Sequence, residues 1–173
     1  MKRQKKMNNK GFSLMELIVV IAIMGVVMVG GVITMGLLFS ASGKEASAKL
    51  NSALIKTRTE SMSKASASVE VYENTADSKY YVAYTISGNK QEPIMIGDSR
   101  VEISYKDSNG TTTNLVAGGQ PLVISFERDT GAFKPIGTAT GNLPIYCREI
   151  TVVSGHKTYT ITCERLTGKT IVK

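Results

Sequence analysis

The chain has 173 residues and a formal net charge of +7, from 21 basic and 14 acidic residues. Five of the basic residues fall within residues 1–11, and the remaining 16 nearly balance the 14 acidic ones. The overall charge therefore does not indicate nucleic-acid binding. Beyond the apolar segment described next, about 130 residues remain, which is enough for one small domain and excludes two.

An uncharged apolar segment extends from Leu17 to Phe39. As a helix, its 23 residues span about 35 Å, which exceeds the hydrocarbon core of a bilayer, about 30 Å. The basic residues before it keep the N-terminus in the cytoplasm and direct the rest of the chain outward. Glu16 lies at the start of this segment, where a carboxylate is costly in lipid and is expected to have a partner.

Two simpler explanations of this segment account for less of the sequence. An ordinary secretory signal has an apolar core of roughly 7–15 residues followed by a small-residue cleavage site. Here the core is longer, and no clear site follows Phe39. A plain single-span anchor explains the apolar run and its basic flank, but it leaves Glu16 and the Gly11-Phe12 pair unexplained.

Type IV pilins and type II secretion pseudopilins have a prepilin signature that this chain resembles at Lys10, Gly11, Phe12, Ser13 and Glu16. The resemblance implies that a prepilin peptidase cuts after Gly11. Phe12 then becomes the first residue and is N-methylated. Glu16 becomes the fifth residue, and in that family the glutamate there attracts the N-terminal amine of a neighbouring subunit during assembly.

The resemblance also implies the partners and the location of the protein. The partners are other pilin subunits, the prepilin peptidase, an inner-membrane assembly platform and membrane lipid. The chain begins as a single-pass cytoplasmic membrane protein with its C-terminal domain outside, and then enters an extracellular or periplasmic filament. The signature is common to pili, secretion pseudopili and competence systems. Many major pilins have a proline where this chain has Ile33, which favours a minor pilin or a pseudopilin.

The chain pattern predicts four parts: a leader at 1–11, a transmembrane and filament-core helix at 12–39, an amphipathic continuation of that helix at 40–67, and a β-rich domain at 68–173. The Ser42-Gly43 pair is the weakest point of the helix. Alternating patterns between turn signals predict antiparallel strands at Tyr80–Ser87, Pro93–Ile96, Val101–Lys106, Thr112–Val116, Leu122–Glu127, Arg148–Val153, Lys157–Cys163 and Thr170–Val172. The predicted fold class is therefore α+β, with a long N-terminal helix packed on an antiparallel sheet domain. The segment from Thr138 to Pro144 is predicted to be a loop.

Cys147 and Cys163 are candidates for a disulfide, because both lie in the exported part of the chain. A three-residue turn at Ser154–His156 places them directly opposite each other, at a separation compatible with a bond. The apolar alternation of the two strands favours another register, in which the cysteines take adjacent positions that face opposite sides. A single β-bulge would reconcile the two demands.

Two C-terminal segments, 124–131 and 159–169, resemble H-type pseudopilins and FimT-like minor pilins. Some FimT-like pilins take part in DNA uptake through basic residues after a late glycine. Lys169 and Lys173 fall near that pattern and are candidate DNA contacts at a filament tip. The simpler interpretation is a solvated terminal strand.

The sequence predicts no enzyme, no cofactor and no metal site. Its single histidine, His156, lies in a predicted turn, and with two cysteines it does not match zinc spacing. No nucleophile elbow, Walker A loop or dinucleotide-binding glycine pattern is present. The scattered carboxylates, such as Glu127 and Asp129, show no paired-acid pattern.

Overall fold

A computed structural model describes residues 13–63, 66–139 and 142–173, with the backbone alone described for 29–39. Its first element is α1 (Leu14–Ser63), a helix of 50 residues. The chain divides into two compact units, residues 1–36 and residues 37–173, so α1 contributes to both. The predicted leader, Gly11 and Phe12 lie outside the described residues.

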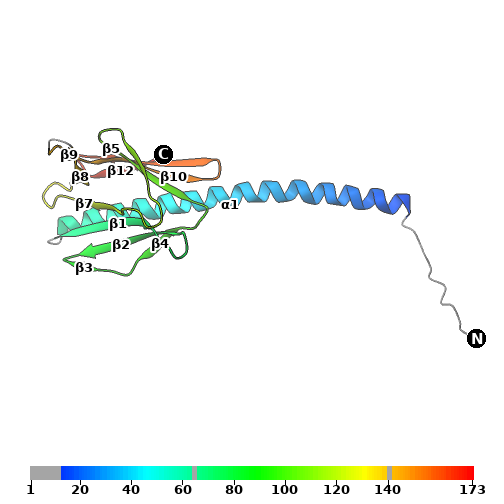
Figure 1. The fold of residues 1–173 in the computed structure, drawn as a ribbon, viewed down its shortest axis with the longest axis horizontal. Coiled ribbons are helices and arrows are strands. Elements are labelled where there is room, and N and C mark those ends of the chain that lie inside the picture. The colour runs from blue at the N-terminus through cyan, green and yellow to red at the C-terminus, as the bar shows by residue number, and fades with distance from the viewer. Residues whose placement is uncertain (1–12, 64–65, 140–141) are drawn as a thin grey trace, which may run out of the picture. The chain divides into compact units, whose positions relative to one another are not determined.

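The second unit contains two antiparallel sheets and the C-terminal part of α1 (Figure 1). Sheet A has the order β3-β2-β1-β7, with β4 also paired to β2, and sheet B has the order β12-β11-β10-β5-β6. The strands of sheet A are β1 (Ala67–Glu73), β2 (Tyr80–Ile86), β3 (Asn89–Lys90), β4 (Ile94–Gly97) and β7 (Leu122–Ser125). The strands of sheet B are β5 (Glu102–Asp107), β6 (Thr112–Asn114), β10 (Cys147–Ser154), β11 (Lys157–Glu164) and β12 (Lys169–Val172). A short pair, β8 (Gly137–Thr138) and β9 (Pro144–Ile145), lies apart from both sheets.

One face of the C-terminal part of α1 forms the centre of the core. Its buried side chains recur at helical spacing, and they are Ala46, Ser47, Leu50, Ala53, Leu54, Thr57 and Ser61. Leu50 and Leu54 belong to the same apolar cluster as Val69 and Val71 of sheet A and Ile161 of sheet B. The helix therefore supplies apolar surface that both sheets cover.

The structure confirms the predicted α+β class and the eight predicted strands, with shifts of at most two residues at their ends. It corrects the end of the helix, which is Ser63 and not about residue 67. It also adds β1, which the sequence analysis missed although it pairs with β2 on one side and β7 on the other. Glutamates at positions 70 and 73 weaken its strand pattern, since Glu is depleted in strands, and pairing on both sides stabilises it.

The predicted turn of the last hairpin is also corrected. Ser154 pairs with Lys157, so the loop consists of Gly155 and His156 alone. Gly155 has a φ of 58°, a left-handed conformation that glycine adopts without a steric penalty. The shorter turn produces the register that the apolar alternation favours, with Ile150 opposite Ile161. The predicted loop after Thr138 contains the β8–β9 pair at its two ends.

Gly43 lies where α1 packs closely against sheet B. A Cβ atom at this position would be 2.8 Å from Cβ of Ser154 and 2.9 Å from the Tyr159 ring. Beside it, the Tyr159 hydroxyl donates a hydrogen bond of 3.0 Å to the Ser40 carbonyl. The glycine that seemed the weakest point of the helix is therefore required by packing.

We expect Gly43→Ala to lower the free energy of unfolding by about 1–2 kcal/mol, because overpacking costs about 1–3 kcal/mol and exceeds the helix-propensity gain of up to about 1 kcal/mol. Urea titration of the full chain, followed by the signal of its tyrosines, measures this change. Gly25→Ala is the matched control, since nothing lies within 4 Å of the Cβ it would add. Equal or higher stability of Gly43→Ala would show that the contact with sheet B is loose.

Candidate functional site

The described N-terminal site begins with a reciprocal cap on α1. The backbone N–H of Ser13 donates to Oε2 of Glu16 at 3.1 Å, and the backbone N–H of Glu16 donates to Oγ of Ser13 at 3.2 Å. Ser13 is thus the N-cap and Glu16 the third helical residue, which is a capping box. The sequence pattern of a capping box is Ser followed three residues later by Glu, and Ser13 and Glu16 have this spacing. The sequence analysis assigned both residues to the prepilin signature alone.

The capping box gives Glu16 a local role within its own chain. Its carboxylate accepts a hydrogen bond at the helix N-terminus, where the helix dipole favours negative charge. The side chain is also exposed, so it remains accessible to a partner. Glu16 therefore combines a charge with a capping function.

The helix that follows the cap carries apolar side chains on all of its faces. Every large apolar side chain between Leu14 and Met28 is 46–77% exposed. A helix that is apolar all round is normally buried, either in lipid or among other helices. Over the described part of the chain, no helix combines the length and hydropathy needed to cross a membrane.

Comparison with known proteins identifies this N-terminal segment. Residues 6–32 match the prokaryotic N-terminal methylation motif. Over these residues the chain is similar to the class III signal peptide of type IV pilins and pseudopilins. No curated protein matches the chain. No solved structure matches it either.

The two cysteines lie on the same face of sheet B because of a β-bulge. The pairing of β10 with β5 shifts between Cys147 and Glu149. The shift leaves Cys147 buried on the same side as Ile150, three residues later, and Cys163 is buried on the side of Ile161. The sequence analysis offered a β-bulge as one way to reconcile the two registers of the hairpin, and the shift observed lies in β10, in its pairing with β5.

Both cysteines are thiols in the structure and both are buried. The pKa of the Cys147 thiol is raised well above its ordinary value, first by its hydrogen-bonding interaction with the Cys163 thiol and then by burial. Sγ of Cys163 also lies 4.0 Å from the Ile161 carbonyl oxygen. The two sulfur atoms are thus neighbours in an apolar setting that suppresses thiolate formation.

The structure places the other predicted residues apart from these sites. Lys169 lies directly opposite Glu164 in the β11–β12 pair, and Lys173 follows the end of β12. Both lysines are exposed, and the facing carboxylate reduces the positive charge of this edge. His156 is exposed in its turn. Among the described residues, no group of His, Cys, Asp and Glu side chains is arranged to hold a metal ion.

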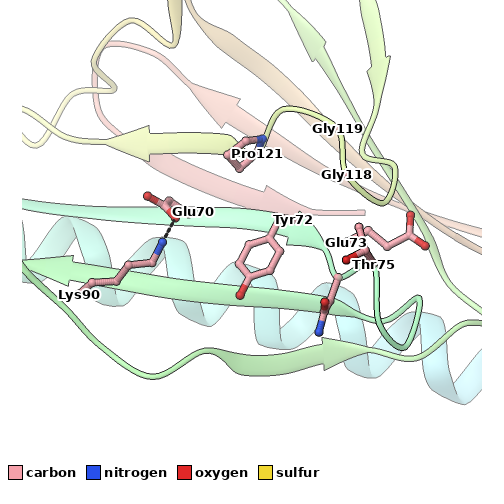
Figure 2. Close-up of a pocket in the computed structure, with 9 residues that line it drawn as sticks. Glu70, Tyr72, Glu73, Thr75, Lys90, Gly118, Gly119 and Pro121 are labelled. Atoms are coloured by element: carbon pink, nitrogen blue, oxygen red, sulfur yellow. Dashed lines mark hydrogen bonds and ion pairs between the residues drawn. The ribbon is translucent and has the colours of Figure 1, made fainter.

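A surface pocket that the sequence analysis did not anticipate lies on sheet A (Figure 2). Its volume is about 300 Å³, and β1, β3 and the two loops that follow β1 and β6 contribute its walls. Tyr72 of β1 occupies the middle of the view, with the Glu70–Lys90 ion pair on one side of it. Because β1 was missed, the outward side chains of that strand were not considered together.

Proposed function

We propose that this chain is a structural subunit of a type IV pilus or of a secretion pseudopilus. A prepilin peptidase cleaves it after Gly11, Phe12 is N-methylated, and the subunit assembles through its N-terminal helix. The observation that carries the proposal is the methylation motif at residues 6–32, followed by a helix that is exposed and apolar on all sides. Before assembly, this helix is held in the cytoplasmic membrane, and in the filament it packs against the same helix of neighbouring subunits.

Burial of the exposed apolar surface supports this assignment. Each large side chain that becomes buried contributes about 1.5–3 kcal/mol, and the apolar surface between Leu14 and Met28 surrounds the helix. A surface of this kind cannot be covered by one partner on one side. Lipid or a bundle of helices covers it on all sides, which suits a subunit that passes from a membrane into a filament core.

Glu16 is proposed to pair with the methylated amine of Phe12 from a neighbouring subunit. Inside a helical bundle a lone carboxylate or a lone ammonium is strongly penalised, and pairing offsets the penalty. The pair then favours one axial register among helices whose apolar contacts would permit several. In the free chain the capping box holds the same carboxylate in place at the start of α1.

The first test is the intact mass and N-terminal sequence of the protein made together with its prepilin peptidase. We expect a chain that begins at methylated Phe12. A chain that still begins at Met1 in the presence of active peptidase would contradict the proposal and indicate a plain single-span anchored domain.

Substitutions at positions 13 and 16 separate charge from capping. Gln at the third helical position still completes a capping box but carries no charge, so we expect Glu16→Gln to be cleaved normally and to be incorporated into filaments as poorly as Glu16→Ala. Ser13→Ala keeps the carboxylate and loses the cap, at a cost of about 0.5–2 kcal/mol, and should be incorporated. The measurement is the amount of each variant in sheared filaments relative to the membrane. Normal incorporation of Glu16→Gln would show that Glu16 acts through the cap alone.

We also propose that Cys147 and Cys163 form a disulfide once the domain is exported. The burial of both side chains on one face of the hairpin and the interaction of their thiols support the bond. It would close a loop of 17 residues and contribute on the order of 3 kcal/mol. An oxidising compartment provides the conditions for it.

Exported protein should therefore be lighter than its reduced form by the mass of two hydrogen atoms. Its free energy of unfolding should fall by about 2–4 kcal/mol on reduction. Cys147→Ala and Cys163→Ala should each abolish the response to reductant, which controls for other effects of the reagent. Two free thiols in exported protein would refute the bond.

A further inference from the structure

The pocket around Tyr72 lies on the face of sheet A that points away from the core. Val69 and Val71 of β1 are fully buried, and Glu70 and Tyr72 alternate with them. Successive side chains of a strand point to opposite faces, so Glu70 and Tyr72 face outward. The loop containing Gly118, Gly119 and Pro121 borders the pocket on the β7 side (Figure 2).

The floor of the pocket is aromatic. Figure 2 shows the Tyr72 ring broadside in the middle of the lining residues. The ring of Tyr81, directly opposite in β2, has its centroid 6.2 Å away and its plane tilted by 23°. The Tyr81 hydroxyl donates to Oδ2 of Asp77 at 2.7 Å, which fixes that ring. Tyr81 stacks with Tyr72 but does not line the pocket, so Tyr72 supplies the aromatic surface of the pocket.

The polar side chains around this floor offer both donors and acceptors. Nζ of Lys90 contacts Oε2 of Glu70 at 2.6 Å, so these two charges largely cancel, while the second carboxylate oxygen and two ammonium hydrogens remain available. Oδ1 of Asn74 accepts from the Ala76 N–H, which leaves the amide hydrogens of Asn74 free to donate. Thr75 adds a hydroxyl, and Glu73 adds a carboxylate at the far end.

We propose that this pocket binds one pyranose ring of a carbohydrate. A pyranose has an apolar face of C–H groups that packs on an aromatic ring, and hydroxyls around its edge that need donors and acceptors together. The volume of about 300 Å³ is at the small end of ligand pockets, which suits a single ring. The site thus matches the two kinds of surface that a sugar presents.

Charged ligands fit the pocket less well. An anion would meet the carboxylates of Glu70 and Glu73, and Lys90 is already paired. A quaternary ammonium group is best held by aromatic rings on several sides, whereas here one ring, that of Tyr72, lines the pocket and the ammonium of Lys90 lies at the edge. A neutral polyhydroxylated ring avoids both conflicts. This proposal does not depend on filament assembly, because all the lining residues belong to one chain.

Saturation-transfer NMR on the full-length chain, kept in a detergent that contains no sugar, tests the proposal. The probes are the methyl glycosides of glucose, galactose, mannose and N-acetylglucosamine. We expect transfer to the ring C–H protons of at least one probe, and binding about tenfold weaker in Tyr72→Ala, since aromatic anchors dominate small interfaces. Tyr146→Ala is the matched control, because Tyr146 is also half-buried and packs under Arg165 outside the pocket.

A second variant narrows the pocket without removing its aromatic floor. Gly118 has a φ of 74°, and a Cβ there would lie 3.5 Å from Cγ2 of Thr75. Asn tolerates this backbone conformation, so Gly118→Asn should fold and should also weaken sugar binding. No transfer to any of the four glycosides, equal transfer in Tyr72→Ala and wild type, or binding of choline in place of the sugars would each overturn the proposal.

Discussion

The packing of the C-terminal part of α1 between two sheets is the constraint on which the rest of the domain depends. Leu50 and Leu54 are fully buried and share one cluster with apolar side chains of both sheets. The helix therefore covers apolar side chains of both sheets. Two hydrogen bonds also join this part of α1 to the rest of the domain. The Ser61 hydroxyl donates to the Ala67 carbonyl, and the Arg58 side chain donates to the Gly131 carbonyl.

The same helix has two different chemical characters along its length. In its first turns the apolar side chains surround it and are exposed. After residue 43 a buried stripe that includes Leu50 and Leu54 faces the sheets, while Ile55 and Met62 remain exposed. A stripe specifies one packing partner, and an all-round apolar surface specifies only an apolar environment. Apolar contacts alone do not fix how far such a helix slides along its neighbours, so a polar group is needed to set the axial register. Among the described residues, Glu16 is the charged group at the start of this apolar surface, and Ser13 holds it there in the free chain.

Much of the fold was predictable because its patterns are local. The helix from residue 14 and eight strands follow from hydrophobic periodicity and turn residues, which neighbouring residues alone determine. β1 was missed because its glutamates obscure its pattern. Its stability comes from pairing with the next strand, β2, on one side and with β7, which is distant in sequence, on the other. The two-residue loop at Gly155 and His156 selected one of the two possible registers of the β10–β11 hairpin. The bulge in β10 then placed both cysteines on the same face.

The sequence by itself determined the methylation motif near the N-terminus. A motif of fixed residue order beside an apolar segment can be recognised without knowledge of tertiary contacts. It also contained the capping box, whose partners are three residues apart. Only the tertiary structure decided which outward side chains share a surface. Tyr72, Lys90 and Gly118 come from three separate segments and meet at one pocket. Their proximity depends on strand order and loop position, which arise from pairing and core packing between residues far apart in the chain.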